Sequence, residues 1–452
     1  MTNERGASAK ARLSVRRHPP HSAFVIRHSP MPPQLLSFLG LLSFIALAWA
    51  LSLDRRRFPV RTVVSGVGLQ FALAFLILKT PPGRKFFTLA NDGIGKLLGY
   101  AEEGVQFVFG PLGDGKLLAE KFGPGHGFIF VVTVTGTIIL VSALSSFLYH
   151  YGILQRVVKG IAWVMQRLMG TSGSESLAAA ANIFMGQTEA PLVIKPYLAR
   201  MTRSEMMALM VGGMATIAGG VLAAYVGFGN AAGRMDMAGH LLTASVMSAP
   251  AALLVAKILL PESEPSETAA GAHAPLERVS QNGIDALCLG AGDGMKLAIN
   301  VMAMLIAFVA VVALANGLLT GAQSALGVAQ PLKLETLFGY ANAPFAWLMG
   351  VPSADCLKLG EVLGTRVVLN EFLGYLNLSE LQKAHAISDR TFTLGTYALC
   401  GFANFSSIAI QIGGIGALAP ERRGELAALG VRAMLGGLLA CYMTAAVVGI
   451  LT

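Results

Sequence analysis

Two glutamates lie in polar clusters inside long apolar stretches of the sequence. Glu189 follows Gly186-Gln187-Thr188 and precedes Ala190-Pro191, and Glu371 stands in Asn370-Glu371-Phe372. An ionisable side chain is costly to place in hydrocarbon, so it persists there only where it faces a cavity, an ion or a polar partner. We therefore expect both carboxylates to belong to a solute site built where membrane helices are interrupted.

A pair of carboxylates can also act as general acid and general base, so an intramembrane hydrolase is the competing class of protein. The sequence contains no His-Glu-x-x-His metal motif and no Gly-x-Ser-x-Gly nucleophile elbow. We therefore predict that the chain is not an enzyme and has no catalytic residues. Movement of a solute without chemical change would separate the two classes.

The composition is that of a membrane protein. Hydrophobic residues make up 54% of the chain, charged residues only 13%, and the mean hydropathy is +0.62. Eight apolar segments are long enough to cross a bilayer core of about 30 Å, which indicates an all-α polytopic fold. These predicted spans are residues 34–53, 62–78, 127–148, 205–228, 237–260, 297–319, 392–418 and 425–451.

Two further apolar stretches, Ser172–Tyr197 and Leu337–Leu376, carry polar clusters near their centres. A re-entrant helical hairpin explains each cluster, because a polar turn is tolerated at membrane depth where protein or a wet cavity surrounds it. The alternative is an ordinary span with a polar face towards its neighbours.

Glycine-rich segments predict interruptions in the helices after each hairpin. Thr216–Gly220 and Gly413–Gly416 can leave helical geometry at low cost and expose carbonyl and hydroxyl oxygens. Close packing of neighbouring helices through small residues explains the same glycines equally well. Hairpin, interrupted helix and closing helix then occur twice, and an odd number of crossings between the copies would invert the second.

These patterns divide the chain into six segments. The first is a basic segment whose composition favours a disordered tail or an over-extended start, with Met31 as the initiator and no nucleic-acid binding. The amphipathic pattern of 86–118 predicts a surface helix within the second. The segments are the tail (1–33), spans and interfacial helices on the scaffold side (34–171), first hairpin, broken helix and closing helix (172–260), polar linker (261–283), interfacial helix and scaffold span (284–336), and second hairpin, broken helix and closing helix (337–452).

Three ordered motifs carry a family resemblance. The runs Gly186-Gln187-Thr188-Glu189-Ala190-Pro191-Leu192, Asn370-Glu371-Phe372 and Gly401-Phe402-Ala403-Asn404-Phe405-Ser406-Ser407-Ile408 resemble signatures of the concentrative nucleoside transporter family. The resemblance extends over nearly all of the chain after about Pro33. Arg366 stands where the family usually has Lys, and Gly350-Val351-Pro352 lacks the Trp that commonly follows, so the detailed substrate preference is in doubt.

The resemblance implies a cation-coupled nucleoside symporter with eight spans and two re-entrant hairpins in each protomer of a homotrimer. It would be an integral membrane protein, placed in a bacterial inner membrane among lipids. The alternatives are a proton-coupled or a passive nucleoside transporter. By motif position, the substrate-binding residues would be Gln187, Thr188, Glu189, Val221 and Phe402 around the nucleobase, and Glu371, Asn404 and Ser407 around the ribose.

For the coupling ion, the resemblance implies sodium and no other cofactor. The family's sodium site would fall on the side chains of Asn182 and Thr216 and the main-chain carbonyls of Met185 and Ile217. All four can supply the oxygen ligands that a small hard cation needs. Coupling to a proton through Glu189 or Glu371 stays open, because burial can raise the pKa of a carboxylate.

Overall fold

The computed structural model describes residues 31–123, 129–272 and 280–452, and all the regular secondary structure in these ranges is helical. The predicted basic tail, apart from its last residues, lies outside the described residues. The helices, in chain order, are α1 (Pro33–Ala50), α2 (Val60–Lys79), α3 (Pro81–Phe109), η1 (Gly110–Gly113), α4 (Gly115–Phe122), α5 (Phe130–His150), α6 (Ile153–Met169), α7 (Gly173–Asn182), α8 (Ala190–Val193), η3 (Lys195–Arg200), α9 (Arg203–Ala215), α10 (Gly219–Ala231), α11 (Met237–Leu259), α12 (Gly283–Ala325), α13 (Leu334–Leu348), α14 (Cys356–Val368), α15 (Glu371–Lys383), α16 (Asp389–Leu399), α17 (Phe405–Leu418), η4 (Pro420–Arg422) and α18 (Arg423–Leu451).

The all-α polytopic class is confirmed, with one change in the count of spans. Seven helical segments among the described residues are long and apolar enough to cross a membrane, against the eight predicted. The predicted span 392–418 is divided into α16 and α17 by a non-helical stretch before Phe405. Each piece is too short to cross a bilayer core of about 30 Å alone. The hydropathy of the sequence does not reveal this break, because the non-helical stretch before Phe405 is itself apolar.

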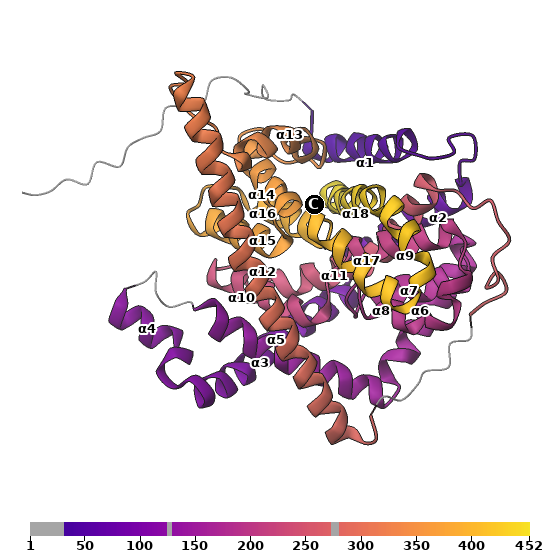
Figure 1. Cartoon of the computed structure of the whole chain (residues 1–452), viewed down its shortest axis with the longest axis horizontal. Helices are drawn as coiled ribbons and strands as arrows, with labels where there is room; N and C mark the ends of the chain where they lie inside the picture. Colours follow the sequence, from indigo (N-terminus) through magenta and orange to yellow (C-terminus); the bar gives the residue numbers. More distant parts are fainter. Residues whose placement is uncertain (1–30, 124–128, 273–279) are drawn as a thin grey trace, which may run out of the picture.

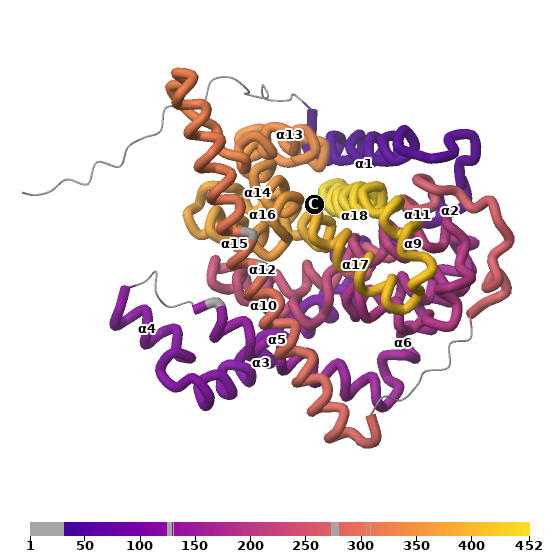
Figure 2. The backbone as a smooth tube through the Cα atoms, viewed as in Figure 1, coloured from indigo at the N-terminus to yellow at the C-terminus, as the bar shows by residue number. Residues whose placement is uncertain are grey.

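The helices form an inner and an outer group. α11, α18 and the pair α9–α10 are mostly buried, whereas α1, α2, α5 and α12 expose most of their apolar surface. Figure 2 shows the C-terminal helices α17 and α18 in yellow beside α9 and α11 of the first half. The two halves of the sequence therefore share one core.

Helix α12 crosses the whole molecule as one continuous element (Figure 1). Its 43 residues correspond to a length of about 65 Å. The division of 284–336 into an interfacial helix and a separate span was therefore wrong, because no residue in this apolar run stops the helix before Ala325. Its main partner is α5.

A helical hairpin occurs in each half, and its re-entry into the membrane stays a prediction. The first consists of α7, the loop 183–189, α8 and η3, and η3 ends at Arg200, beyond the predicted stretch Ser172–Tyr197. The second is α14 and α15, whereas the predicted stretch Leu337–Leu376 begins inside the separate helix α13. α13 is more apolar than α14 and α15, so the apolar run begins before the hairpin. The turn occurs at Leu369-Asn370, where the Asn370 side chain accepts a hydrogen bond from the Leu373 N–H and starts α15.

One predicted interruption is present and the other is not. The chain leaves helical geometry between α9 and α10, with extended backbone at Thr216 and Ala218. Gly413–Gly416 lies inside the continuous helix α17, so its predicted unwinding was wrong. The second break falls instead at 400–404, between α16 and α17. Glycine permits unwinding but does not enforce it, and here Asn404 sets the start of α17 by capping it.

The polar linker after α11 is attached to the helices at Thr268, although half of residues 261–272 are exposed, and residues 273–279 lie outside the described residues. Thr268 is buried, its main-chain carbonyl accepts from the Gly173 N–H at 2.8 Å, and its hydroxyl donates to Ser174. Glu205 accepts from the hydroxyls of Ser174 and Ser266. Hydrogen bonds therefore connect residues 261–272 to the N-terminal ends of α7 and α9. We call this polar, hydrogen-bonded end of the first hairpin its base.

Candidate functional site

Glu371 is the first residue of α15 and is only 6% exposed. The Tyr225 hydroxyl donates to Oε1 at 2.9 Å, and Nδ2 of Asn404 donates to Oε2 at 3.1 Å. The partial positive charge of the α15 N-terminus adds favourable electrostatics for an anion at this position. The carboxylate is thus held by donors from α10, the second break and its own helix.

The orientation of Asn404 follows from its role as a helix cap. Its Oδ1 accepts from the Ser407 backbone N–H at 2.9 Å and from the Ser406 hydroxyl at 2.7 Å. A backbone N–H can only donate, so the amide oxygen must face α17. The amide NH2 group therefore faces Glu371.

The tip of the first hairpin reaches the same turn of α17. Nε2 of Gln187 donates to Oγ of Ser407 at 3.1 Å, and Gln187 is 7% exposed. Residues from the first hairpin, the second hairpin and the second break, far apart in sequence, therefore meet around the first turn of α17. This is the arrangement that the motifs predicted for Gln187, Glu371, Asn404 and Ser407.

Thr188 and Glu189 differ from Gln187 because both are exposed. Oε2 of Glu189 accepts from the Gly186 backbone N–H at 3.2 Å, within its own loop. Thr188 lies against α17, since a Cβ added at Gly414 would be 3.2 Å from its Cγ2. The structure therefore does not bring the two glutamates into one hydrogen-bonded group.

Val221 and Phe402 flank the two breaks. Val221 is buried in the first turn of α10, and its N–H donates to the Ala218 carbonyl. Phe402 is half-buried in the second break, and its N–H donates to the Thr216 carbonyl at 3.3 Å. The two breaks are therefore hydrogen-bonded to each other, and each contributes one apolar side chain.

The four residues expected to hold the ion lie at the first hairpin and the first break. Asn182 ends α7 and is 1% exposed, yet neither atom of its amide group has a hydrogen-bond partner among the described residues. The Thr216 hydroxyl donates to the Asn182 carbonyl at 3.1 Å, and Ile217 is buried beside it. Met185 follows in the loop and is half-buried. A buried amide oxygen without a donor is suited to a cation ligand.

Two residues of this region were not predicted from the sequence. Tyr225 is fully buried and donates to Glu371, and Gln411 is fully buried and donates to Gln187. Gln411 lies four residues after Ser407, on the same face of one helix. The prediction that residues 413–416 are unwound placed Gln411 beside a break, so its helical spacing from Ser407 did not single it out. Tyr225 had no comparable signal, because one tyrosine in an apolar helix is common.

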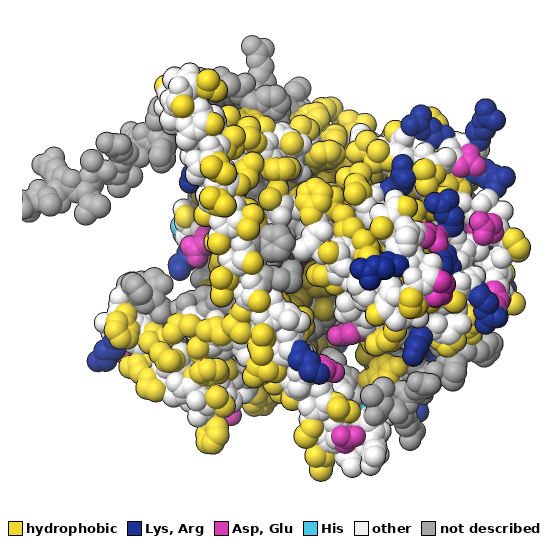
Figure 3. All heavy atoms as spheres, viewed as in Figure 1, with side chains coloured by type: hydrophobic (Ala, Val, Ile, Leu, Met, Phe, Trp, Pro, Cys, Tyr) yellow, Lys and Arg dark blue, Asp and Glu magenta, His cyan; other side chains and the backbone are white. Residues whose placement is uncertain are grey.

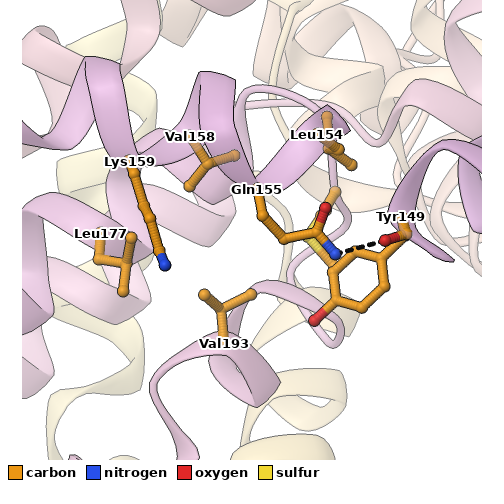
Figure 4. A pocket seen from close by; sticks show the side chains of 8 residues that line it. Tyr149, Leu154, Gln155, Val158, Lys159, Leu177 and Val193 are labelled. Carbon is orange, nitrogen blue, oxygen red and sulfur yellow. Dashed lines mark hydrogen bonds between the residues drawn. The ribbon is translucent and has the colours of Figure 1, made fainter. Parts of the chain in front are cut away.

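Two hollows lie near the first hairpin, and Met185 is among the residues that line the smaller one. A small one, with a volume of about 10 Å³, is enough for about one water molecule and lies between α6 and the first hairpin, where Tyr149, Gln155, Lys159 and Val193 surround it (Figure 4). A larger one of about 440 Å³ lies at the base of that hairpin, beside the ion pair of Lys257 with Glu175 at 2.7 Å. Neither is lined by a residue that contacts Glu371.

Comparisons with known protein families cover most of the chain. Residues 39–112 match the family described as Na+ dependent nucleoside transporter N-terminus, and residues 240–449 match Na+ dependent nucleoside transporter C-terminus. Residues 131–232, which contain the first hairpin and the first break, match the family described as nucleoside recognition.

Individual relatives agree with these matches. The chain is 43% identical over 420 residues to an uncharacterized transporter of Haemophilus influenzae, covering 92% of this chain and 97% of the relative. It is 41% identical over 434 residues to sodium/nucleoside cotransporter 1 of Rattus norvegicus, covering 93% of this chain and 64% of that longer protein.

A solved structure also matches. The structure of CNTnw in an inward-facing substrate-bound state superposes with a TM-score of 0.85 at 40% sequence identity, covering 92% of this chain and 97% of that chain.

Proposed function

Since the chain belongs to the Na+-dependent, concentrative nucleoside transporter family, we propose that it is a sodium-coupled symporter that accumulates nucleosides across a membrane. The protein is a membrane transporter and not an enzyme. The observation that carries the proposal is the meeting of both hairpins at the first turn of α17, around Glu371 and Ser407.

The chemistry of the side chains assigns the two ends of the substrate. Glu371, Asn404 and Ser407 offer the carboxylate, amide and hydroxyl groups that suit the vicinal hydroxyls of a ribose. Gln187 and the exposed Thr188 and Glu189 supply donors and acceptors for a nucleobase edge. Val221 and Phe402 supply apolar contact for its ring. A nucleoside in this place would bridge the two hairpins.

The unpaired amide of Asn182 supports a sodium site at the first hairpin. Asn182 and Thr216 would act with the carbonyls of Met185 and Ile217, all at the loop or break next to Gln187. Sodium would then fix the loop that carries Gln187 and so raise the affinity for the nucleoside. By thermodynamic linkage, the nucleoside raises the affinity for sodium by the same factor.

The surface supports a location in the bacterial inner membrane. Much of the face in Figure 3 is hydrophobic, and Lys and Arg side chains gather towards one edge. Hydrogen bonds place several helix ends together there, since Arg61 donates to the Arg167 carbonyl and Arg422 to the Met201 carbonyl. The positive-inside rule assigns this end to the cytoplasm.

The exposed apolar surface of α12 supports contact with lipid and with other protomers. Ile306, Leu314 and Leu318 are each more than 60% exposed on this helix. Apolar side chains facing outwards suit both hydrocarbon and a subunit interface. We assign this surface to the homotrimer and the surrounding lipid. The mass of the detergent-solubilised particle, corrected for bound detergent, tests the trimer.

Transport in liposomes tests the function. Purified protein is reconstituted, and uptake of radiolabelled uridine and adenosine is measured with an inward sodium gradient and with choline in place of sodium at fixed pH. We expect accumulation above the external concentration that requires sodium. Accumulation driven by a pH gradient without sodium would establish proton coupling instead, and equilibration without accumulation would establish a passive transporter.

A further inference from the structure

A chain of hydrogen bonds runs from the backbone of α9 to the tip of the first hairpin. Nε2 of Gln411 donates to the main-chain carbonyl of Met210 at 3.0 Å and to Oε1 of Gln187 at 3.2 Å. Nε2 of Gln187 then donates to Oγ of Ser407 at 3.1 Å. Two amides in series thus connect an element of the protein core to the proposed nucleobase contact.

The backbone carbonyl at the start of this chain fixes its direction. A carbonyl oxygen can only accept, so the amide of Gln411 must turn its NH2 group towards Met210. The same NH2 group faces Gln187, which must therefore present its own oxygen to Gln411 and its NH2 group to Ser407. Reversing the amide of Gln411 would place its oxygen against two acceptor oxygens, and reversing the amide of Gln187 would place two NH2 groups against each other.

The packing leaves no space for Gln411 to serve as a direct contact of a ligand. Gln411 is fully buried, and its Oε1 has no hydrogen-bond partner among the described residues. A Cβ added at Gly213 would lie 2.6 Å from Nε2 of Gln411 and 2.9 Å from Cβ of Gln187. The absence of a side chain at Gly213 therefore lets α9 approach both amides and hold them in place.

We propose that Gln411 is a positioning residue that holds the amide of Gln187 in its donor orientation and thereby makes the transporter select nucleobases with a carbonyl acceptor at the edge facing the first hairpin. This inference rests on the proposed function, because it takes Gln187 as a nucleobase contact. The oriented Gln187 amide then presents a donor to the base, and Glu371 presents its carboxylate acceptor to the ribose.

Competition for uridine uptake tests this assignment. The competitors are unlabelled uridine and 4-deoxyuridine, which keeps the ribose, the six-membered ring and the 2-carbonyl but lacks the 4-carbonyl acceptor and the N3–H donor. In the unaltered protein we expect 4-deoxyuridine to inhibit at least about 10-fold more weakly than uridine, because it leaves a buried donor unpaired. In Gln411→Met, which keeps the length but removes the amide, the amide of Gln187 can turn over, and the difference should shrink to about 3-fold or less.

Gln70→Met is the matched control. Gln70 is also fully buried, and its Nε2 donates to a main-chain carbonyl, that of Met247, and to Thr444, far from the site. The Gln70→Met variant should keep the full difference in inhibition between uridine and 4-deoxyuridine. A general loss of packing would lower uptake in both variants without changing the ratio. If Gln411→Met does not insert in the membrane, Gln411→Asn carries the same test, since its amide is one methylene too short to reach both partners.

The double variant Q187A/Q411M checks that the effect passes through Gln187. We expect the second substitution to add no further change in the ratio when Gln187 is already alanine. An unchanged ratio in Gln411→Met, or equal inhibition by both competitors in the unaltered protein, would overturn the proposal while leaving sodium-dependent uptake intact. Absence of any nucleoside uptake by the unaltered protein would instead contradict the proposed function.

Discussion

The two glutamates that look alike in the sequence occupy different environments in the structure. Glu371 is buried and accepts hydrogen bonds from Tyr225 and Asn404, whereas Glu189 is exposed and accepts from its own loop at Gly186. At the first hairpin the buried polar contact is the neutral Gln187. The two hairpin tips therefore differ in chemistry, because the first offers buried amide donors and the second a buried carboxylate.

The bases of the two hairpins also differ. Each base has a carboxylate, but at the first hairpin it lies on the broken helix and at the second it lies next to the hairpin. At the first, the carboxylate of Glu205 lies on the broken helix and accepts from Ser174 of the hairpin. At the second, the carboxylate of Asp355 precedes the hairpin helix α14 and accepts from Ser388 and Thr391 at the start of α16. Each hairpin is thus tied to the broken helix that follows it.

The largest expected effect comes from Glu371→Gln. The substitution removes the charge and places an NH2 group against either Tyr225 or Asn404, both of which donate. Hydrogen bonds to a charged group contribute about 1.5 to 3 kcal/mol each, so we expect sodium-driven uridine uptake to fall at least about 100-fold. The measurement is initial uptake in liposomes, normalised to inserted protein.

Glu189→Gln is the paired variant. Because its side chain is exposed, it should leave thermal stability unchanged and lower uptake less than the change at Glu371. Equal losses at the two positions would mean that the contrast in burial has no functional meaning. Normal uptake and normal sodium dependence in Glu371→Gln would remove Glu371 from the site.

Much of the fold could be predicted because it depends on the length of apolar segments. Six predicted spans correspond to long apolar helices and a seventh to the pair α9–α10, and the first helical hairpin and first break lie where the polar residues 187–189 and Thr216 indicated. The second hairpin was misplaced because α13 is more apolar than the hairpin beside it, so the apolar run begins too early. The glycine pattern did not predict the break before Phe405, because this break depends on one capping side chain, Asn404, rather than on a run of glycines.

The site residues were predicted only in part, for a related reason. Residues in the motifs at the hairpin tips, such as Gln187 and Glu371, could be named from the sequence. Tyr225 and Gln411 act by holding those residues, and such a role depends on which helices face each other. That information lies in the packing of α10 against α15 and of α17 against the first hairpin. Spacing along one helix does not contain it.

The next largest effect concerns the ion and extends the comparison to the first hairpin. Asn182→Ala removes the buried amide that has no partner among the described residues, and so removes one proposed oxygen ligand. We expect the sodium concentration for half-maximal uptake to rise at least about 10-fold, the effect typical of losing a group that supports a metal site. Uridine affinity at saturating sodium should change far less. The measurement is uptake against sodium concentration at constant ionic strength.

Asn342→Ala provides the control for that variant. Asn342 is also a buried asparagine, but its amide group has partners, since it donates to the Phe338 carbonyl and accepts from Tyr442. It should show the sodium dependence of the unaltered protein even if stability is lower. A parallel shift in both variants would indicate a general loss of packing and would count against a sodium ligand at Asn182.

The smallest expected effect tests whether the donors Tyr225 and Asn404 hold the carboxylate of Glu371 in place. Tyr225→Phe removes one of the two side-chain donors to the carboxylate and leaves the ring, which stacks on Tyr375 with centroids 4.4 Å apart. Losing one hydrogen bond to the charged carboxylate should lower the affinity for uridine about 10-fold. Tyr375→Phe is matched, because its hydroxyl donates to the Thr396 carbonyl at 2.8 Å instead of to Glu371. A decrease confined to Tyr225→Phe would link the first half of the chain to the ribose contact through α10, whereas equal decreases would place the effect in the packing of the two rings.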